Sequence, residues 1–483
     1  PSSPATLAWV EALDGGDPRN PGPARDRIAL LTAPFTGPPA ELARTGARVF
    51  GVSWLDADER ALVRTYDRAT RMRTTALVDA RTPGAAPQTI STLRDGDAYG
   101  DPGTPVSTTS RDGQTVIARA GDAIWLRGAG AGASGRRPFL DRFDVRTLET
   151  VRLFRSELTP LETPLLPLDP DAAQLLTQRQ SPADPPNVFV RTRASGALRA
   201  LTSFADPAPQ LRGIGRRVVT YKRADGIDLS FTLYTPPGWH EGTRLPAFVW
   251  AYPLEYLDRG TASQNTNTTQ TFVQVTGPSP LFLALAGYAV LDNAAMPIVG
   301  NPATVNDTYV DQLTMDAKAA VDEAVRIGVA DPDRIAVGGH SYGAFMTANL
   351  LAHTRLFKAG IARSGAYNRT LTPFGFQNEK RSYWEATDLY TKMSPFTYAN
   401  AIKDPLLLIH GMADDNTGTF PIQSERLYAA IQGNGGTARL VMLPYEAHGY
   451  VGRESVETTV AEMLDWLNRW LGPARTSVKA AER

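Results

Sequence analysis

Ser341 lies between two glycines in the sequence GHSYG at residues 339–343, and a serine held in such a turn is typical of a nucleophile. The residues RIAVG before it predict a buried strand, and YGAFMTANLLAHT after it predicts a helix. At a tight junction between strand and helix, side chains in place of the glycines would collide with either element. This context favours a nucleophilic serine over an ordinary glycine-rich turn.

A serine nucleophile needs a general base, and histidine is the most common one. The five histidines of the chain are His240, His340, His353, His410 and His448. His448 follows the last predicted strand in LPYEAHGY, and loops at the carboxyl ends of parallel strands form the active sites of α/β proteins. His340 is next to the serine, but we expect it to pack against the sheet, because neighbouring side chains on such a turn point in different directions. His240 lies in no motif, and we expect His353 to end a helix and His410 to shape the loop after its strand.

The acid that orients this base is expected between the serine and the histidine in the chain, which is the order found on the α/β-hydrolase fold. The sequence IHGMADDN supplies two candidates, Asp414 and Asp415, directly after a predicted strand. The carboxylate would fix the imidazole tautomer and stabilise the imidazolium that forms when His448 takes the proton of Ser341. Spacing alone does not separate the two aspartates.

An oxyanion site is also required. On this fold it uses the backbone N–H of the residue after the nucleophile, here Tyr342, and a second donor from the loop after an earlier strand. The sequence VWAYPLEY at 249–256 is that loop, which makes Tyr252 the second predicted donor. Simple packing of an aromatic side chain at a strand end is the alternative for Tyr252.

Apolar strands alternate with amphipathic helices in the second half of the chain, and these elements must position the residues named above. The predicted strands are 246–252, 288–294, 334–340, 359–365, 405–411 and 438–444, and the predicted helices are 314–328, 342–354, 420–433 and 455–471. Near-continuous apolar strands between helices indicate a mostly parallel sheet covered on both faces. An antiparallel pair closed by a Pro-Gly turn is expected at 216–239. We therefore predict an α/β-hydrolase domain at 214–472, followed by a polar tail at 473–483.

Residues 1–213 predict a different, all-β architecture. Short β-rich segments are separated by turns, and polar turns recur at 56–59, 110–113 and 169–172. That interval is typical of one four-stranded blade of a β-propeller, so we predict three to four blades. An irregular β-sandwich is the alternative. Because three to four blades are few for a closed propeller, we expect the propeller to be truncated at its N-terminus and the native protein to contain the missing segment.

Composition excludes several kinds of chemistry and partner. The chain has 50 basic and 50 acidic residues, so its net charge gives no reason to expect nucleic acid as a partner. It has no cysteine, which excludes disulfides, thiol nucleophiles and cysteine metal sites, and no apolar run reaches the length of a membrane span. No P-loop or H-E-x-x-H motif is present, and the glycine-rich stretch at 128–135 lacks the following helix of a phosphate site. We therefore expect no metal and no cofactor.

Three motifs occur in the order GGHSYGA, HGMADDN and EAHGY after the propeller-like half. Together they resemble the prolyl oligopeptidase family of serine peptidases. Within that family, the residues at 250–253, 338–353 and 362–379 are most similar to the glutamyl endopeptidase branch, which cleaves after Glu. The resemblance covers residues 215–472 well and the first half only through its blade-like pattern. It implies a serine peptidase that acts on peptides or small proteins through an acyl-enzyme.

The family pattern also implies roles for individual residues. By this resemblance Ser341 is the nucleophile, Asp414 the orienting acid and His448 the base. Tyr252 stands directly before Pro253, where related enzymes have an oxyanion donor. Relatives with an HGGP loop differ from the WAYP of this chain, so the sequence leaves open whether Tyr252 acts through its amide or its hydroxyl.

Cleavage after Glu requires a cation in the substrate pocket, because a carboxylate is strongly disfavoured in a dry site without one. Arginine suits this role, since its planar guanidinium binds a carboxylate through two parallel hydrogen bonds. Arg369 is the first candidate, because the equivalent segment in relatives helps to line the pocket, and Arg363 and Arg381 follow. A surface or structural ion pair is the alternative for Arg369.

Three other functions compete with this hypothesis. They are a dipeptidyl or acylaminoacyl peptidase of the same family, an esterase or lipase, and a propeller-based binding protein with an inactive hydrolase. The chain has no adjacent Glu-Glu pair of the kind that dipeptidyl peptidases use, and a propeller that filters peptides by size argues against an esterase. All three triad residues are present, which argues against an inactive protein. The content of Ala, Arg, Gly and Pro suggests a bacterial source, and we expect a periplasmic or secreted protein rather than a cytoplasmic one.

Overall fold

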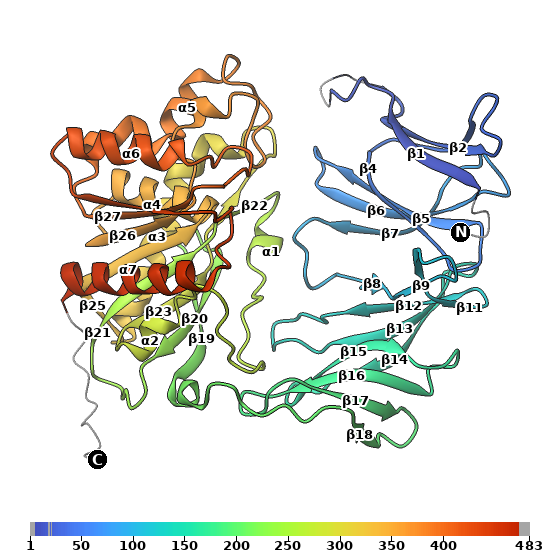
Figure 1. Ribbon diagram of the computed structural model, residues 1–483, viewed down its shortest axis with the longest axis horizontal. Helices are drawn as coiled ribbons and strands as arrows, with labels where there is room; N and C mark the ends of the chain where they lie inside the picture. Colours follow the sequence, from blue (N-terminus) through green and yellow to red (C-terminus); the bar gives the residue numbers. More distant parts are fainter. Residues whose placement is uncertain (1–4, 18–19, 21, 473–483) are drawn as a thin grey trace. The chain divides into compact units, whose positions relative to one another are not determined.

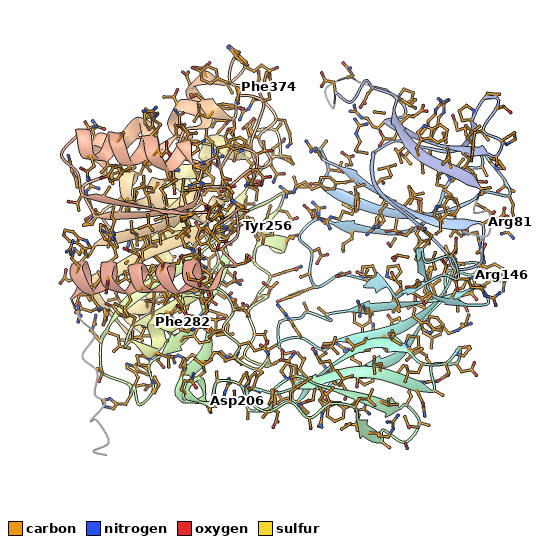
Figure 2. The ribbon with its side chains drawn as sticks, in the orientation of Figure 1. Arg81, Arg146, Asp206, Tyr256, Phe282 and Phe374 are labelled. Atoms are coloured by element: carbon orange, nitrogen blue, oxygen red, sulfur yellow. The ribbon has the colours of Figure 1, made fainter. Side chains whose placement is uncertain are left out.

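The computed structural model describes residues 5–17, 20 and 22–472 (Figure 1). The predicted polar tail at 473–483 lies outside the described residues. The chain forms two compact units. The first consists of the residues up to Asp206, which is labelled in Figure 2, together with Gln270–Phe272, and the second consists of the rest of the described chain.

The first unit is built from antiparallel sheets (Figure 1). One sheet has three strands, β1–β3; two have four strands, β4–β7 and β15–β18; and one has five, β11–β14 with β8. Strands β9 and β10 pair separately. Sheets of about four antiparallel strands, each paired with the next strand in the chain, are typical of propeller blades. The bounds are β1 (Thr6–Ala12), β2 (Asp26–Thr32), β3 (Ala40–Thr45), β4 (Arg48–Trp54), β5 (Arg60–Asp67), β6 (Met72–Asp79), β7 (Gln88–Arg94), β8 (Thr104–Pro105), β9 (Ser107–Thr109), β10 (Thr115–Ile117), β11 (Arg119–Ala120), β12 (Ala123–Gly128), β13 (Phe139–Asp144), β14 (Thr150–Arg155), β15 (Leu161–Pro167), β16 (Gln174–Gln180), β17 (Asn187–Thr192) and β18 (Leu198–Ala200).

An eight-stranded sheet forms the centre of the second unit, in the order β19-β20-β23-β21-β25-β26-β27-β28. The β19–β20 and β20–β23 pairs are antiparallel, and the remaining pairs are parallel. Strands β22 and β24 form a separate small sheet. The bounds are β19 (Gly215–Lys222), β20 (Asp228–Thr235), β21 (Leu245–Ala251), β22 (Leu254–Tyr256), β23 (Ala289–Ala294), β24 (Pro297–Val299), β25 (Ala330–His340), β26 (Ala359–Arg363), β27 (Leu406–Gly411) and β28 (Ala438–Leu443).

Helices cover both faces of this sheet, so its inner strands are almost entirely apolar. Helices α3, α4 and α6 pack on one face through Leu313, Phe345 and Leu427, and α2 and α7 pack on the other through Leu283 and Leu467 (Figure 1). The bounds are α1 (Arg259–Ala262), α2 (Phe282–Leu285), α3 (Tyr309–Arg326), α4 (Tyr342–His353), α5 (Thr387–Met393), α6 (Ile422–Gly433) and α7 (Arg453–Leu471), and the short 3-10 turns are η1 (Pro209–Gly213), η2 (Val305–Thr308), η3 (Arg369–Leu371) and η4 (Pro395–Ala401).

The elements of the second unit lie close to their predicted positions. The helix predicted at 342–354 is α4, and the strand predicted at 405–411 is β27. The predicted antiparallel pair at 216–239 is present as β19 and β20, but its turn lies at 223–227, and the Pro-Gly sequence follows β20. The strands predicted in the first unit were 5–13, 47–55, 115–128, 141–147, 165–170, 188–192 and 198–204, so β2, β3, β5, β6, β7 and β16 were among those missed. In β5 and β6, arginine and threonine interrupt the apolar positions.

The glycine-rich stretch at 128–135 lies beside the segment that the second half of the chain contributes to the first unit. The Gln270 side chain accepts a hydrogen bond from the backbone N–H of Arg136 at 2.7 Å. It also donates to the carbonyl oxygens of Arg136 and Leu158, at 2.9 and 2.6 Å. The backbone beside the glycine-rich stretch is therefore held in place by hydrogen bonds with the carboxamide of Gln270.

Candidate active site

Ser341 occupies a strained turn at the carboxyl end of β25. Its φ of 58° and ψ of −115° lie outside the regions that non-glycine residues normally adopt. The backbone N–H of Ser341 donates to the carbonyl oxygen of Arg363 at 2.8 Å, which ties the turn to the neighbouring strand β26. Helix α4 begins at the next residue, Tyr342. The serine is therefore held at the edge of the sheet where the parallel strands end.

Gly339 and Gly343 permit this turn because each lies directly against backbone. A Cβ on Gly339 would lie 2.4 Å from the carbonyl carbon of Gly343, and a Cβ on Gly343 would lie 2.4 Å from the carbonyl oxygen of Ala251. Cβ atoms in proteins do not approach other atoms this closely. The motif thus has glycines at positions 339 and 343 because β25, α4 and the end of β21 come into contact at this turn.

Asp414 and His448 come together on the loops that follow β27 and β28. His448 Nδ1 lies 2.9 Å from Asp414 Oδ2. The Asp414 side chain is fully buried, whereas that of His448 is 28% exposed. Asp415 faces solvent. Bonding at Nδ1 leaves Nε2 of His448 as the ring atom that can accept a proton.

The carboxylate of Asp414 has further donors that sequence reasoning missed. The backbone N–H of Asn416 donates to Oδ1 at 3.0 Å, and the Thr419 hydroxyl lies 3.3 Å from both carboxylate oxygens. His410 Nε2 lies 3.1 Å from Oδ2. The sequence signal for His410 was its place at a strand end four residues before Asp414, but the contact depends on how the loop returns. These bonds fix the carboxylate that faces His448.

Glu446 holds the loop that carries His448. Its carboxylate accepts hydrogen bonds from the backbone N–H groups of Val451 and Gly452, each at 2.9 Å. Burial raises the pKa of Glu446, but the bonds from Val451, Ser455 and Gly452 outweigh that effect and lower the pKa below its usual value. The charged carboxylate therefore closes the loop around the histidine.

The ring of His340 packs against the ring of His448. The sequence predicted that His340 packs against the sheet. Its ring centroid lies 4.8 Å from that of His448 and 5.9 Å from that of Tyr450. Burial, assisted by the charge of Arg363, lowers the pKa of His340 to about 3. His340 is therefore a neutral ring beside His448 at physiological pH.

Tyr342 and Tyr252, the two predicted oxyanion donors, lie next to each other. Their ring centroids are 6.0 Å apart in an edge-to-face arrangement. Tyr342 is buried, and its hydroxyl donates to the Glu255 carboxylate at 3.1 Å, whereas the side chain of Tyr252 is largely exposed. Glu255, which the sequence gave no reason to select, also accepts from Asn378 and precedes Tyr256, labelled in Figure 2. The side chain of Tyr342 is thus anchored immediately after the serine.

Arg369 is a buried cation on the other side of Tyr342. Its guanidinium carbon lies 4.0 Å from the ring centre of Phe345, 4.4 Å from that of Phe376 and 5.8 Å from that of Tyr342. Only 4% of the residue is exposed, and its Nε has no hydrogen-bond partner. Burial lowers the pKa of the guanidinium, against the opposing effect of Tyr342. No described carboxylate forms an ion pair with Arg369, but the charge of the buried Glu255 carboxylate is near enough to act on the guanidinium and to raise its pKa.

The other two candidate arginines have different surroundings. Arg363 lies 4.4 Å above the ring of Trp250 and donates to the carbonyl oxygen of Pro278 at 2.6 Å, on the face of the sheet that α7 covers. Burial lowers the pKa of Arg363 to about 10. Arg381 forms ion pairs with Glu379 at 2.8 Å and Asp307 at 2.7 Å, so its charge is already neutralised. The structure does not bring these two arginines together with Arg369.

These features define a class of protein. A mostly parallel sheet with a strained serine after one strand and an Asp–His pair after two later strands is the arrangement of the α/β-hydrolases. Residues 304–474 match the family described as the prolyl oligopeptidase family. Residues 304–474 therefore form a domain of this family, and the resemblance predicted from the motifs is confirmed.

Two plant proteins show the branch to which the chain is similar. It is 41% identical to "Probable glutamyl endopeptidase, chloroplastic" of Oryza sativa subsp. japonica over 97% of this chain and 52% of that protein. It is 40% identical to the protein of the same name from Arabidopsis thaliana over 97% of this chain and 51% of that protein. The chain therefore spans about half the length of these relatives. The prediction that it carries a peptidase domain is confirmed.

Solved structures share the fold. A Mycobacterium tuberculosis puromycin-hydrolyzing peptidase matches with a TM-score of 0.65 and 19% identity, over 97% of this chain and 68% of that one. An acylaminoacyl peptidase in complex with a chloromethyl ketone matches with a TM-score of 0.64 and 18% identity, over 98% of this chain and 72% of that one. The predicted fold class, an α/β-hydrolase domain after an all-β propeller-like part, is confirmed. Among the helices described for this chain, none has the length and apolar character needed to cross a membrane.

Proposed function

We propose that this chain is a serine peptidase that cleaves peptide bonds after Glu through an acyl-enzyme. Ser341 is the nucleophile, His448 the general base and Asp414 the acid that orients it. The 2.9 Å contact between His448 Nδ1 and Asp414 Oδ2 and the strained turn at Ser341 support these roles.

The reaction proceeds in two halves. Ser341 Oγ attacks the carbonyl carbon of the substrate while His448 Nε2 takes the hydroxyl proton, and Asp414 stabilises the resulting imidazolium. The imidazolium then gives its proton to the leaving amine as the C–N bond breaks, which leaves the acyl group on Ser341. Water, activated by the same histidine, cleaves this ester and restores the free serine.

The negative oxygen of each tetrahedral intermediate requires donors. We assign the backbone N–H groups of Tyr342 and Tyr252 to this role. The close approach of Gly343 to the carbonyl oxygen of Ala251 supports the choice of the Tyr252 amide, because it brings the backbone at the end of β21 against the elbow. Replacing Tyr252 by Phe should then leave kcat within about threefold, whereas a donating hydroxyl would make kcat fall about 10²–10³-fold.

The buried, unpaired charge of Arg369 is the observation that carries the proposed specificity. A cation among aromatic rings is stabilised by them, but a carboxylate ligand would neutralise it and bind its planar guanidinium through two bonds. The contact of Arg369 with the ring of Tyr342 brings this cation near the residue that follows the nucleophile. A Glu side chain before the scissile bond is the substrate group that fits this site.

The test is cleavage-site mapping on a mixed peptide library, with matched peptides that differ only in Glu or Gln before the cut. Arg369→Met should lower kcat/KM for the Glu peptide about 10²–10³-fold and leave the Gln peptide nearly unchanged. Arg369→Lys should retain part of the preference, and Arg381→Lys is the matched control that should retain all of it. An unchanged Glu preference in Arg369→Met contradicts the assignment, and release of dipeptides or acylated residues would favour the other peptidases of the family.

The predicted location outside the cytoplasm belongs to the same proposal. It is supported by the composition of the chain, and the plant relatives are named as chloroplastic proteins. Fractionation of the source cells with an antibody against the chain tests it, and recovery in the cytoplasmic fraction would contradict it.

A further inference from the structure

His410 is a buried histidine that the proposed reaction does not use, yet it bonds the same carboxylate oxygen as the proposed base. Its side chain is fully buried at the end of β27. His410 Nε2 lies 3.1 Å from Asp414 Oδ2, and His448 Nδ1 lies 2.9 Å from the same atom. Two imidazoles therefore meet on one oxygen of Asp414.

The partners of His410 determine which nitrogen carries its proton. Nε2 faces two acceptors, the Asp414 carboxylate and the carbonyl oxygen of Thr419 at 2.6 Å. Nδ1 lies 2.7 Å from the hydroxyl of Ser424, which can donate to it. In a neutral ring protonated at Nε2, this one N–H is shared between the nearer Thr419 carbonyl and the Asp414 carboxylate, and Nδ1 accepts from Ser424. Burial lowers the pKa of His410, although the Asp414 charge opposes the effect, so the ring is neutral near pH 7.

Other titratable groups surround the pair on the neighbouring elements. His340, at the end of β25, packs against His448 with its ring tilted, and Arg363 lies at the end of β26. The loop after β28 supplies Glu446, which bonds backbone N–H groups, and Tyr450, whose hydroxyl donates to the carbonyl oxygen of Ile409.

Asp415, next to the acid, faces solvent. The donors to Asp414 that the described residues provide are His410, His448, Thr419 and the Asn416 backbone. Among these described donors, His410 is the fully buried titratable side chain, whereas the side chain of His448 is 28% exposed.

We propose that His410 is a positioning residue that sets the proton affinity of the Asp414–His448 pair. The inference rests on the roles proposed for Asp414 and His448. A second N–H on Oδ2 stabilises the carboxylate charge, which weakens its attraction for a proton on His448. Because Oδ2 is bonded by both rings, the carboxylate is also held against rotation.

Two amide variants separate this role from simple filling of space. The amide nitrogen of Gln reaches about as far as Nε2 of histidine, and that of Asn about as far as Nδ1. His410→Gln therefore keeps a donor for Asp414 and the Thr419 carbonyl, whereas His410→Asn keeps only a partner for Ser424. Both variants place the same chemical group in the same cavity.

The experiment measures kcat/KM against pH for the wild type and the two variants, with a Glu-containing peptide. The acidic limb of the profile reports the apparent pKa of the coupled pair. In His410→Asn the limb should move upward by about one pH unit, and in His410→Gln it should stay within about 0.3 unit of the wild type. An unmoved limb in His410→Asn, with only kcat reduced, would overturn the proposal, as would equal shifts in both variants.

A measurement on the wild type removes the dependence on a folded Asn variant. Nitrogen-15 NMR of the histidine rings should show His410 as the neutral Nε2–H tautomer at neutral pH. A charged ring or the Nδ1–H tautomer at neutral pH contradicts the proposal. Fluorophosphonate labelling of Ser341 separates the two levels of argument: a labelled enzyme with an unmoved limb refutes only the role of His410, whereas an unlabelled wild type refutes the proposed function together with it.

Discussion

The two residues that flank Ser341 contact regions of opposite chemical character. Before the serine, the ring of His340 packs on His448, whose acid Asp414 accepts hydrogen bonds from several donors. After the serine, the ring of Tyr342 contacts Arg369, a buried cation that lies among aromatic rings and forms no ion pair with a described carboxylate. The acid in the first region is bonded directly by its partners, whereas the cation in the second region interacts with the Glu255 carboxylate without forming an ion pair.

This difference distinguishes side chains whose polar groups are bonded within the protein from side chains whose charge a ligand could bind. A buried acid with all its acceptors bonded has a fixed orientation before any substrate arrives. A buried cation without a direct ion pair is unfavourable for the free protein, and an anionic ligand relieves that penalty on binding. The contrast supports the proposal that the Asp414 region carries out the reaction and that the Arg369 region selects the substrate.

Replacing Asp414 by Asn breaks the complete region and should have the largest effect. An amide cannot stabilise the imidazolium, so kcat should fall about 10⁴-fold with little change in KM. The matched control is Asp415→Asn, an exposed change next to it, which should stay within about twofold in steady-state kinetics. A larger loss in the control than in Asp414→Asn would reverse the assignment of the acid.

Gly343→Ala tests the turn that separates the two regions. The new Cβ would lie 2.4 Å from the carbonyl oxygen of Ala251, so the elbow must move away from β21. We expect kcat to fall about 10²-fold and the free energy of unfolding to fall by about 2 kcal/mol or more. Urea unfolding and peptide kinetics measure the two effects, and Gly433→Ala, where nothing lies within 4 Å of a Cβ, is the control. Equal behaviour of the two variants would contradict the close approach.

Replacing Arg369 by Met should change the free energy of unfolding of the free protein. Because the arginine is buried without a direct ion pair, an apolar side chain of similar length should raise the free energy of unfolding by about 1–3 kcal/mol while the Glu preference is lost. Thermal or urea unfolding of the free protein measures this gain. A loss of several kcal/mol in the free energy of unfolding would mean that Arg369 stabilises the folded protein and is not held in place for a ligand.

His340→Phe should have no large effect on stability at pH 7 and a growing one in acid. Burial, with the charge of Arg363, lowers the pKa of His340 from 6.5 to about 3, so the unfolded chain binds more protons than the folded chain between these values. The wild type therefore loses stability as the pH falls below 6.5, and the Phe variant lacks this contribution. Urea unfolding at pH 7 and at about pH 4.5 should show a smaller decrease for the variant, by about 1 kcal/mol or more. Parallel decreases would show that His340 is protonated within the fold.

Much of the fold and of the site could be predicted because the signals are local in the sequence. The nucleophile motif includes its own strand, turn and helix, and the loops of Asp414 and His448 directly follow apolar strands. The choice between Asp414 and Asp415 depended on family resemblance, since adjacent residues have the same spacing. In the structure the two differ in burial and in their contact with His448.

Other features could not be predicted because they depend on contacts between distant segments. In the sequence, Arg369 does not differ from any other loop arginine. Its burial among aromatic rings without an ion pair can be seen only in the folded chain. Glu255 lies in a short strand and bonds Tyr342, 87 residues later in the chain. Strands β5 and β6 were not predicted from the sequence, because their polar residues interrupt the alternation of apolar and polar positions that is typical of a strand. In the structure they are stabilised by pairing with neighbouring strands.

The left-handed backbone of Ser341 has a consequence for how activity is lost. A strained residue keeps its conformation only while the surrounding sheet and helix enforce it, so its turn should relax during partial opening of the protein. In a urea titration, reaction of Ser341 with a fluorophosphonate should therefore disappear at a lower denaturant concentration than the circular dichroism of the helices. The nucleophile then acts as an internal reporter of the integrity of the central strands, and its labelling measures local opening that global unfolding does not detect.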